Sequence, residues 1–238
     1  MAGPIQQRLL PDTAAIDTDG QATVGGCRLT DLADQFGTPL FVYDEEHLRA
    51  RCREAVAAFG PGVSYASKAF LCGAMARLVV EEGMHIDVST GGELYMARHA
   101  GVPGEKLVMH GNNKSELELR MAIDEGVRRI VVDSFDELDR LEALHAETGV
   151  TPKILLRITP GVEAHTHEFI STGQDDSKFG FTVSTGLAAI AVERAVVSSA
   201  VELMGVHCHI GSQVFEVGSF ARTVEIMAQF SVPLGLPD

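Results

Sequence analysis

The sequence predicts an α/β protein of the (β/α)8 TIM-barrel type, with about six of the eight strands present. From residue 63 onward, short apolar segments typical of β-strands alternate with amphipathic stretches typical of helices. These segments are GVSYAS, MHIDVST, KLVMHG, RRIVVDS, KILLRIT and ELMGVHCHIGS. The first five recur about every 21 to 24 residues, the length of one strand and its helix, which predicts a parallel sheet. No GxGxxG motif follows the first strand, which favours a barrel over a doubly wound sheet.

Two of the intervening helices have clear start signals. Thr90 is followed by Glu93, and Ser134 by Glu137, and both pairs fit the capping box in which a hydroxyl and a glutamate satisfy free backbone N–H groups. After Ser134 an apolar stripe marks the face that packs on the sheet, formed by Phe135, Leu138, Leu141 and Leu144.

The chain is expected to have two parts. Residues 1–40, with Gly25, Gly26 and alternating apolar positions, predict a small β-rich lead-in. Residues 41–238 predict an incomplete barrel, entered through a helix over Asp44–Phe59. No segment after the last predicted helix supplies strands seven and eight.

A long polar insertion interrupts the barrel pattern between Ile158 and Leu203. The interval is about twice the usual strand and helix unit and contains TPGVEAHTHEFISTGQDDSKFGF. Such an insertion after a strand is more often a functional loop than a filler.

Composition narrows the classes of function. The chain has 238 residues, 45% of them hydrophobic, which is enough for a proper core. A net charge of −14 disfavours nucleic-acid and anionic-membrane partners, and no run approaches the roughly 18 apolar residues of a membrane span. Four scattered cysteines without a CxxC pair, and an N-terminus without signal-peptide features, predict a cytoplasmic protein that acts on a small molecule.

Reactive side chains follow the predicted strands. The carboxyl ends of barrel strands face a common bowl, and six such residues fall there: Lys68, Asp87, His110, Arg157, His209 and Ser212. Lys68 in YASKAF is either a solvated loop lysine or an amine that forms a Schiff base with a carbonyl, which makes pyridoxal phosphate the candidate cofactor.

The other groups leave alternatives open. His207 and His209 share a strand face, so they fit a metal site, a packed pair, or contact with a flat ring whose phosphate meets Gly211 and Ser212. Arg157 needs an anionic or phenolate partner, or a salt bridge to an acid such as Asp87.

Three further features have plainer interpretations. Asp87 could also orient His209, and Asn112–Ser115 reads as a loop and helix cap. His165 and His167 could form a metal pair, but the acids around them are irregularly spaced. No metal is predicted.

Several blocks resemble a known family. YASKAF at 65–70, DVSTGGEL at 87–94, HGNNKS at 110–115, VEAHTHEFISTG at 162–173, SKFG at 177–180 and HIGSQ at 209–213 are similar to the diaminopimelate decarboxylase family. That family lies within the alanine-racemase-like, fold-type III pyridoxal-phosphate enzymes. The resemblance runs from about residue 25 to about residue 225.

The resemblance implies roles for these residues. Lys68 would hold pyridoxal 5'-phosphate, His209 would stack on its ring, and Gly211 and Ser212 would contact its phosphate. Asp87 and Arg157 would line the ring and support His209. The implied reaction is decarboxylation of meso-2,6-diaminopimelate to L-lysine, in a homodimer with shared active sites.

The sequence also departs from the family pattern. It contains no counterpart of the glycine-rich phosphate loop, of the glutamate on the pyridine nitrogen, or of the C-terminal β-domain with its cysteine and tyrosine. We therefore expect a chain truncated before that domain and inactive, or nearly so, alone. The alternatives are an ornithine or arginine decarboxylase, an amino-acid racemase, a non-catalytic pyridoxal-phosphate-binding barrel, and a metal-dependent barrel hydrolase using His207 and His209.

Overall fold

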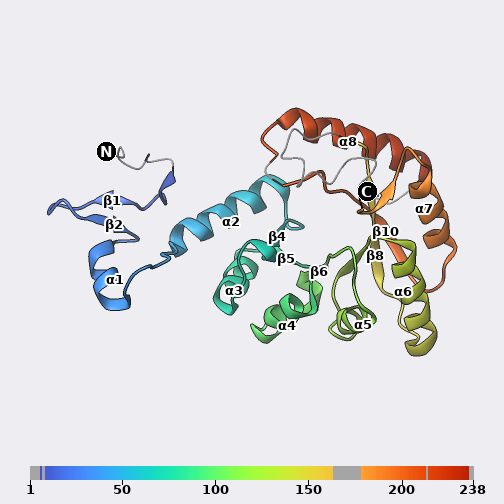
Figure 1. The fold of residues 1–238 in the computed structure, drawn as a ribbon, viewed down its shortest axis with the longest axis horizontal. Helices are drawn as coiled ribbons and strands as arrows, with labels where there is room; N and C mark the ends of the chain where they lie inside the picture. The colour runs from blue at the N-terminus through green and yellow to red at the C-terminus, as the bar shows by residue number, and fades with distance from the viewer. Residues whose placement is uncertain (1–5, 7–8, 163–177, 213, 236–238) are drawn as a thin grey trace. The chain divides into compact units, whose positions relative to one another are not determined.

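The structure is a computed structural model that describes residues 6, 9–162, 178–212 and 214–235 (Figure 1). The chain divides into two compact units. The first comprises Met1–Tyr65 with Leu78–His85, and the second Ala66–Arg77 with Ile86–Asp238. Among the helices of the described residues, none combines the length and the hydropathy needed to cross a membrane.

The first unit begins with the predicted β-rich lead-in. Strands β1 (Ala15–Ile16), β2 (Ala22–Val24) and β3 (Cys27–Arg28) pair antiparallel in that order. Helix α1 (Leu29–Phe36) follows, a helix that the alternating pattern did not predict. Helix α2 (Glu45–Phe59) is the predicted entry helix, and its cap is Asp44, which accepts a hydrogen bond from the His47 N–H at 3.2 Å.

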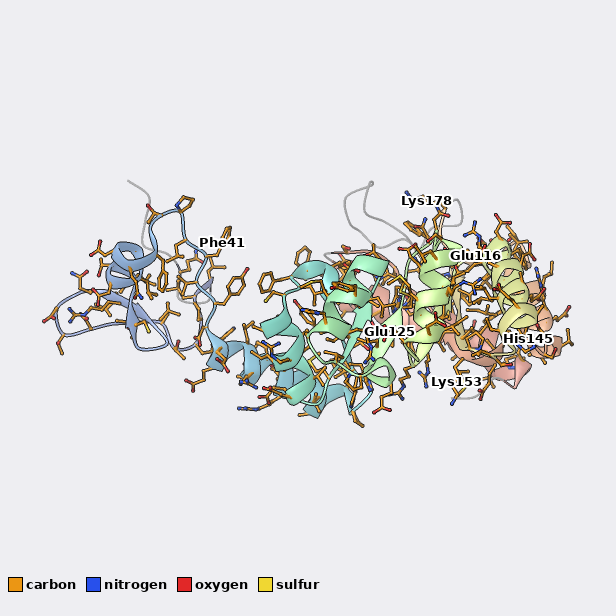
Figure 2. The ribbon with its side chains drawn as sticks, turned by 90° about the horizontal axis from the view of Figure 1, so that it is seen from below. Phe41, Glu116, Glu125, His145, Lys153 and Lys178 are labelled. Carbon is orange, nitrogen blue, oxygen red and sulfur yellow. The ribbon has the colours of Figure 1, made fainter. Side chains whose placement is uncertain are left out.

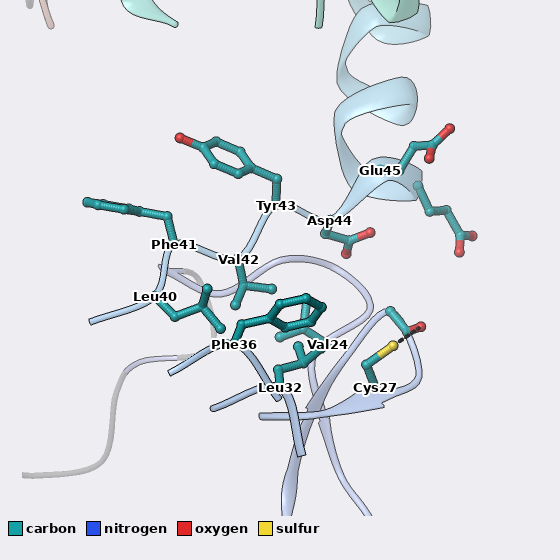
Figure 3. Close-up of a pocket in the computed structure, with 12 residues that line it drawn as sticks. Val24, Cys27, Leu32, Phe36, Leu40, Phe41, Val42, Tyr43, Asp44 and Glu45 are labelled. Carbon is teal, nitrogen blue, oxygen red and sulfur yellow. Dashed lines mark hydrogen bonds between the residues drawn. The ribbon is translucent and has the colours of Figure 1, made fainter. Parts of the chain in front are cut away.

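An apolar hollow of about 520 Å³ lies in this first unit (Figure 3). Its lining combines side chains from β2, α1 and the segment that leads into α2, and Figure 3 draws Phe36, Leu40 and Val42 close together. Phe41, beside them in the sequence, has 86% of its surface exposed. The lead-in therefore presents apolar side chains to its surroundings.

The predicted six-strand sheet is confirmed. Its order is β4 (Ser64–Ala66), β5 (His85–Val88), β6 (Leu107–Met109), β7 (Arg129–Val132), β8 (Lys153–Thr159) and β10 (Glu202–His207). The pairings from β5 to β10 are parallel, and the short β9 (Phe181–Thr182) also pairs with β8.

Helices alternate with these strands, as a βα rhythm requires. They are α3 (Gly73–Glu81), α4 (Gly91–His99), α5 (Glu116–Asp124), α6 (Phe135–Thr148), α7 (Leu187–Val197) and α8 (Val217–Ser231), with 3-10 turns η2 (Ser67–Ala69), η3 (Gly104–Lys106) and η5 (Val232–Leu234). Figure 1 shows α4, α5 and α6 following one another along one side of the sheet. The predicted stripe of α6 is confirmed at Leu138, Leu141 and Leu144, all of them buried.

The strands are apolar on both faces. Ile130, Val131 and Val132 of β7 are all buried, and so are Ile154 and Leu156 of β8. Continuous apolar runs are typical of a parallel sheet that is covered on both sides. This burial fixes the strands, and with them the positions at which their carboxyl ends expose polar residues.

The last strand ends earlier than predicted. The segment ELMGVHCHIGS reads as one strand, but β10 ends at His207. Its pairing with β8 stops at Arg157, after which Ile158 and Thr159 of β8 pair with β9 instead. His209, Gly211 and Ser212 therefore lie in the segment beyond the strand, and Gly211 has the positive φ of 139° that favours glycine.

Candidate cofactor site at the carboxyl ends of the strands

Lys68 lies in η2, directly after the first strand of the sheet. Its side chain is exposed, while the neighbouring Ser67 is buried and its hydroxyl makes no hydrogen bond to another described residue. An exposed lysine amine is the kind of group that forms a Schiff base with a carbonyl compound.

Asp87 and two histidines form a cluster across the same end of the sheet. The Asp87 Oδ1 lies 3.4 Å from the ring Nε2 of His110. The backbone N–H of His110 donates a hydrogen bond to the Val88 carbonyl at 2.7 Å. The His207 ring meets the His110 ring edge-on, with the ring centres 5.0 Å apart. The structure thus places Asp87 against His110, whereas the sequence suggested His209.

Arg157 pairs with Asp133, and not with the suggested Asp87. The Arg157 Nη1 donates to the Asp133 Oδ2 at 3.0 Å, and the Gly180 N–H donates to the Asp133 Oδ1 at 2.6 Å. The Arg157 guanidinium also lies over the Phe179 ring, 4.4 Å from its centre. Both oxygens of a buried carboxylate are therefore used to hold the arginine and the segment that contains Gly180.

Gly180 approaches the backbone of β8 closely. It has a positive φ of 70°, and a Cβ added to it would lie 2.6 Å from the Arg157 carbonyl oxygen. No other residue type fits there without moving β8.

Lys114 and Glu137 form a buried ion pair behind this group. Their Nζ and Oε1 atoms lie 2.7 Å apart, and the two side chains are 1% and 2% exposed. Sequence analysis placed Lys114 in a loop and gave Glu137 a capping role alone. The hydroxyl half of each predicted capping box is present, but Glu93 and Glu137 accept from Ser89 and Asp133, one residue before the cap.

The electrostatics of the site keep two imidazoles neutral. Burial, helped by His110 and Arg157, lowers the pKa of His207 to about 3. Burial, helped by Arg157 and Lys68, lowers the pKa of His209 to about 4. The positive charge of Lys68 thus disfavours protonation of the His209 ring.

The remaining candidate residues are only partly described. Ser212 is exposed, and Gly211 is half-buried. His165 and His167 lie outside the described residues. Across the described part of the chain, His, Cys, Asp and Glu side chains form no group of three or more that could hold a metal ion.

Sequence reasoning missed Asp133, although a signal existed. Asp133 directly follows the apolar run of β7, the same position relative to a strand that singled out His110 after β6. Lys114 and Glu137 carried no such signal, because an ammonium and a carboxylate that become buried together look like ordinary surface residues in a sequence.

These groups fit a flat, anionic aldehyde. Lys68 offers an amine, His209 offers a neutral ring, Arg157 offers a cation, and Gly211 and Ser212 offer an N–H and a hydroxyl. The buried His207 Nδ1 makes no hydrogen bond to another described residue, so the bowl has polar capacity left for a ligand. The fold and the site together define a pyridoxal-binding α/β barrel domain.

Comparison with known proteins gives the family. Residues 45–234 match the family model described as "Pyridoxal-dependent decarboxylase, pyridoxal binding domain", and the chain belongs to this family. Diaminopimelate decarboxylase from Mycobacterium tuberculosis is 51% identical over 212 residues, covering 88% of this chain and 47% of that protein. The Bacillus subtilis enzyme is 48% identical over 221 residues, covering 91% of this chain and 50% of that protein.

A solved structure agrees with these relatives. Diaminopimelate decarboxylase from M. jannaschii, crystallised with L-lysine, superposes with a TM-score of 0.87 at 37% identity. The match covers 94% of this chain and 54% of that chain. The present chain therefore spans about half the length of the relatives that it matches.

Proposed function

We propose that this chain holds pyridoxal phosphate on Lys68 and forms the cofactor-binding part of a decarboxylase that converts meso-diaminopimelate to L-lysine. The observation that carries the proposal is the position of Lys68 after the first strand, in the bowl whose groups fit this cofactor. The substrate assignment rests on relatives named diaminopimelate decarboxylase at about half identity.

Each residue has a task in this proposal. Lys68 binds the aldehyde carbon through its Nζ, and the neutral imidazole of His209 packs on the ring. The Gly211 N–H and the Ser212 hydroxyl donate hydrogen bonds to the phosphate. Arg157, held by Asp133, supplies positive charge near the bound anion.

The His110 imidazole, set against Asp87, completes the wall of the bowl. What pyridoxal phosphate supplies when bound is an electron sink, which takes up the electron pair that a departing α-carboxylate leaves behind. We expect these 238 residues alone to bind the cofactor but to turn over diaminopimelate little or not at all, because they span about half the length of the relatives.

We also propose that the protein works in the cytoplasm, as part of a homodimer. All four cysteines are free, which suits a reducing compartment. The dimer is what the family resemblance implies.

An absorbance titration tests cofactor binding. Purified protein mixed with pyridoxal phosphate is expected to gain a band near the edge of the visible range, and Lys68→Ala is expected to lose it. The control is Lys153→Ala, because Lys153 is an exposed lysine at the amino end of β8 (Figure 2). Equal spectra for the wild type and Lys68→Ala would contradict the assignment.

Ligand discrimination tests the substrate. With cofactor loaded, meso-diaminopimelate is expected to change the absorbance at lower concentration than ornithine or arginine does. Any product should be L-lysine. Preference for ornithine or arginine would move the chain to a related decarboxylase.

A further inference from the structure

Lys114 makes contacts with three segments that are separate in the sequence. Its Nζ donates to the Gly111 carbonyl at 2.6 Å, to the Val131 carbonyl at 2.7 Å, and lies 2.7 Å from the Glu137 Oε1. Two of the three ammonium N–H groups are thus used in hydrogen bonds to backbone carbonyls, and the charge is paired with the Glu137 carboxylate. The side chain therefore fixes the loop after β6, the strand β7 and the start of α6 to one another.

Glu137 connects these contacts to the backbone of Asp133. The Glu137 Oε2 accepts a hydrogen bond from the Asp133 N–H at 3.1 Å, and the Glu137 N–H donates to the Ser134 hydroxyl. The backbone that leaves β7 is thus held on both sides of the helix cap. Asp133 in turn uses both carboxylate oxygens on Arg157 and Gly180, so the chain of contacts runs from Lys114 to the guanidinium in the bowl.

A glutamate can hold the start of a helix without a buried lysine beside it, as α4 shows. Glu93 does the same work at α4, where its Oε2 accepts from the Ser89 N–H at 2.6 Å. Among the ion pairs between described residues, none includes Glu93. Because the α4 start is built without a lysine, the Lys114–Glu137 pair calls for a different explanation.

Stability alone does not explain the pair either. A buried ion pair that is replaced by apolar residues often leaves a protein equally or more stable, so such pairs are retained for other reasons in some proteins. Here the pair sits directly behind the Asp133–Arg157 contact, and the four charges balance.

We propose that Lys114 and Glu137 are positioning residues for the cofactor site, acting through Asp133 to set the Arg157 guanidinium. This inference rests on the function proposed above. The two residues touch no ligand themselves; they fix the backbone from which Asp133 holds Arg157. Loss of the pair therefore weakens the binding of pyridoxal phosphate even where the fold survives.

The test separates position from stability. The double variant Lys114→Met/Glu137→Met replaces the pair by apolar side chains and removes the acceptor for the Asp133 N–H. It is expected to fold with a lowered Tm, because the Asp133 N–H and the Gly111 and Val131 carbonyls lose their partners, while its Kd for pyridoxal phosphate, measured by absorbance titration well below that Tm, rises at least tenfold. Arg120→Met is the matched control, because Arg120 of α5 forms partly exposed ion pairs with Glu116 of α5 and Glu147 of α6. Its Kd is expected to equal that of the wild type.

A combination with Arg157→Met tests whether Lys114 and Glu137 act on cofactor binding through Arg157. Positions that act through one group are not additive, so adding the double variant to Arg157→Met should raise the Kd no further. Additive losses would place the effect of Lys114 and Glu137 elsewhere and overturn the proposal.

Other outcomes also decide the question. A double variant that folds and binds with the wild-type Kd overturns the positioning role. A double variant that does not fold overturns it as well, because the pair would then be required for folding. The wild type and Lys68→Ala are compared first. If the wild-type chain gives no band that depends on Lys68, the function proposed above is contradicted, and this failure is separate from any result on the Lys114 variants.

Discussion

Two sets of ion pairs in this chain differ in burial and behave oppositely. In the first unit Arg49 and Arg53 pair with Glu82; the side chains of the two arginines are 25% and 63% exposed, and that of Glu82 is 11% exposed. Hydrogen bonds from Arg53 and Arg49 lower the pKa of Glu82. In the second unit burial raises the pKa of Glu137, even though Lys114 lies against it.

The difference shows what each set is for. Near water, the charged form of a carboxylate is favoured by its partners at little cost in desolvation. In the interior, desolvation exceeds the attraction of a partner, so a pair persists only where its geometry is tightly held. The more exposed set joins α2 to Glu82, whereas the buried set fixes the backbone behind the site.

The largest predicted effect is at the buried pair. Lys114→Met leaves the Glu137 carboxylate without its partner in the interior, and we expect a loss of about 3 to 5 kcal/mol in the free energy of unfolding. Denaturant titration measures it. Glu82→Gln in the more exposed set is the comparison and is expected to lower the midpoint less, because its partners favour the charged carboxylate at a smaller cost in desolvation; equal losses for the two variants would contradict the distinction.

Apolar packing of the second unit gives the next effect. Leu141 on α6 is fully buried, so Leu141→Ala should cost about 2 to 5 kcal/mol through lost burial and the cavity left behind. Leu117→Ala is the control, because Leu117 on α5 is 67% exposed. Similar stabilities of the two variants would mean that α6 is not packed on the sheet as described.

A pH effect should follow from the buried histidine. The pKa of His207 is about 3 in the folded protein and near 6.5 when unfolded, so below about pH 6.5 the unfolded chain binds a proton that the folded chain does not. Stability should therefore fall by about 2 kcal/mol between pH 7 and pH 5 from this group.

Substitution of His207 tests this pH effect, and substitution of an exposed histidine is the control. His207→Gln should show a shallower fall in stability over the same range, and the exposed His99→Gln should keep the wild-type slope. Equal slopes for all three proteins would show that His207 is charged or solvated in the folded state. Asp87, His110, His209 and Arg157 surround the same ring and remain unchanged in both variants.

The smallest predicted effect lies in the first unit. Asp44 caps α2 and also accepts a hydrogen bond from the Thr13 hydroxyl. Asp44→Ala should lower the free energy of unfolding by about 1 kcal/mol, the usual loss for a helix cap. Asp34→Ala, an exposed position in α1, should cost less, and a larger loss there would contradict the capping role.

Sequence reasoning predicted most of the sheet because its signals are local. Apolar runs, a regular repeat and helix caps identified the six strands and the stripe of α6. It failed where partners come from distant segments. Arg157 was given Asp87 as a possible partner, but the acid within reach is Asp133, which becomes its neighbour only when β7 and β8 pair.

Two other errors have the same origin. The last strand was predicted to reach Ser212, but its end depends on where β8 changes its pairing from β10 to β9. Lys114 and Glu137 were taken for loop and cap residues, because their burial together is a property of the assembled layers. Both features depend on contacts between strands and helices that are distant in the sequence.

The most direct test of the account is chemical labelling of Lys68. Protein mixed with pyridoxal phosphate is reduced with borohydride, digested and mapped by mass spectrometry. The account predicts one major label, on the Lys68 peptide, with Lys114 unlabelled because its amine is buried, donates to two backbone carbonyls and is paired with Glu137. A label distributed over exposed lysines such as Lys153 and Lys178, with none on Lys68, would contradict it.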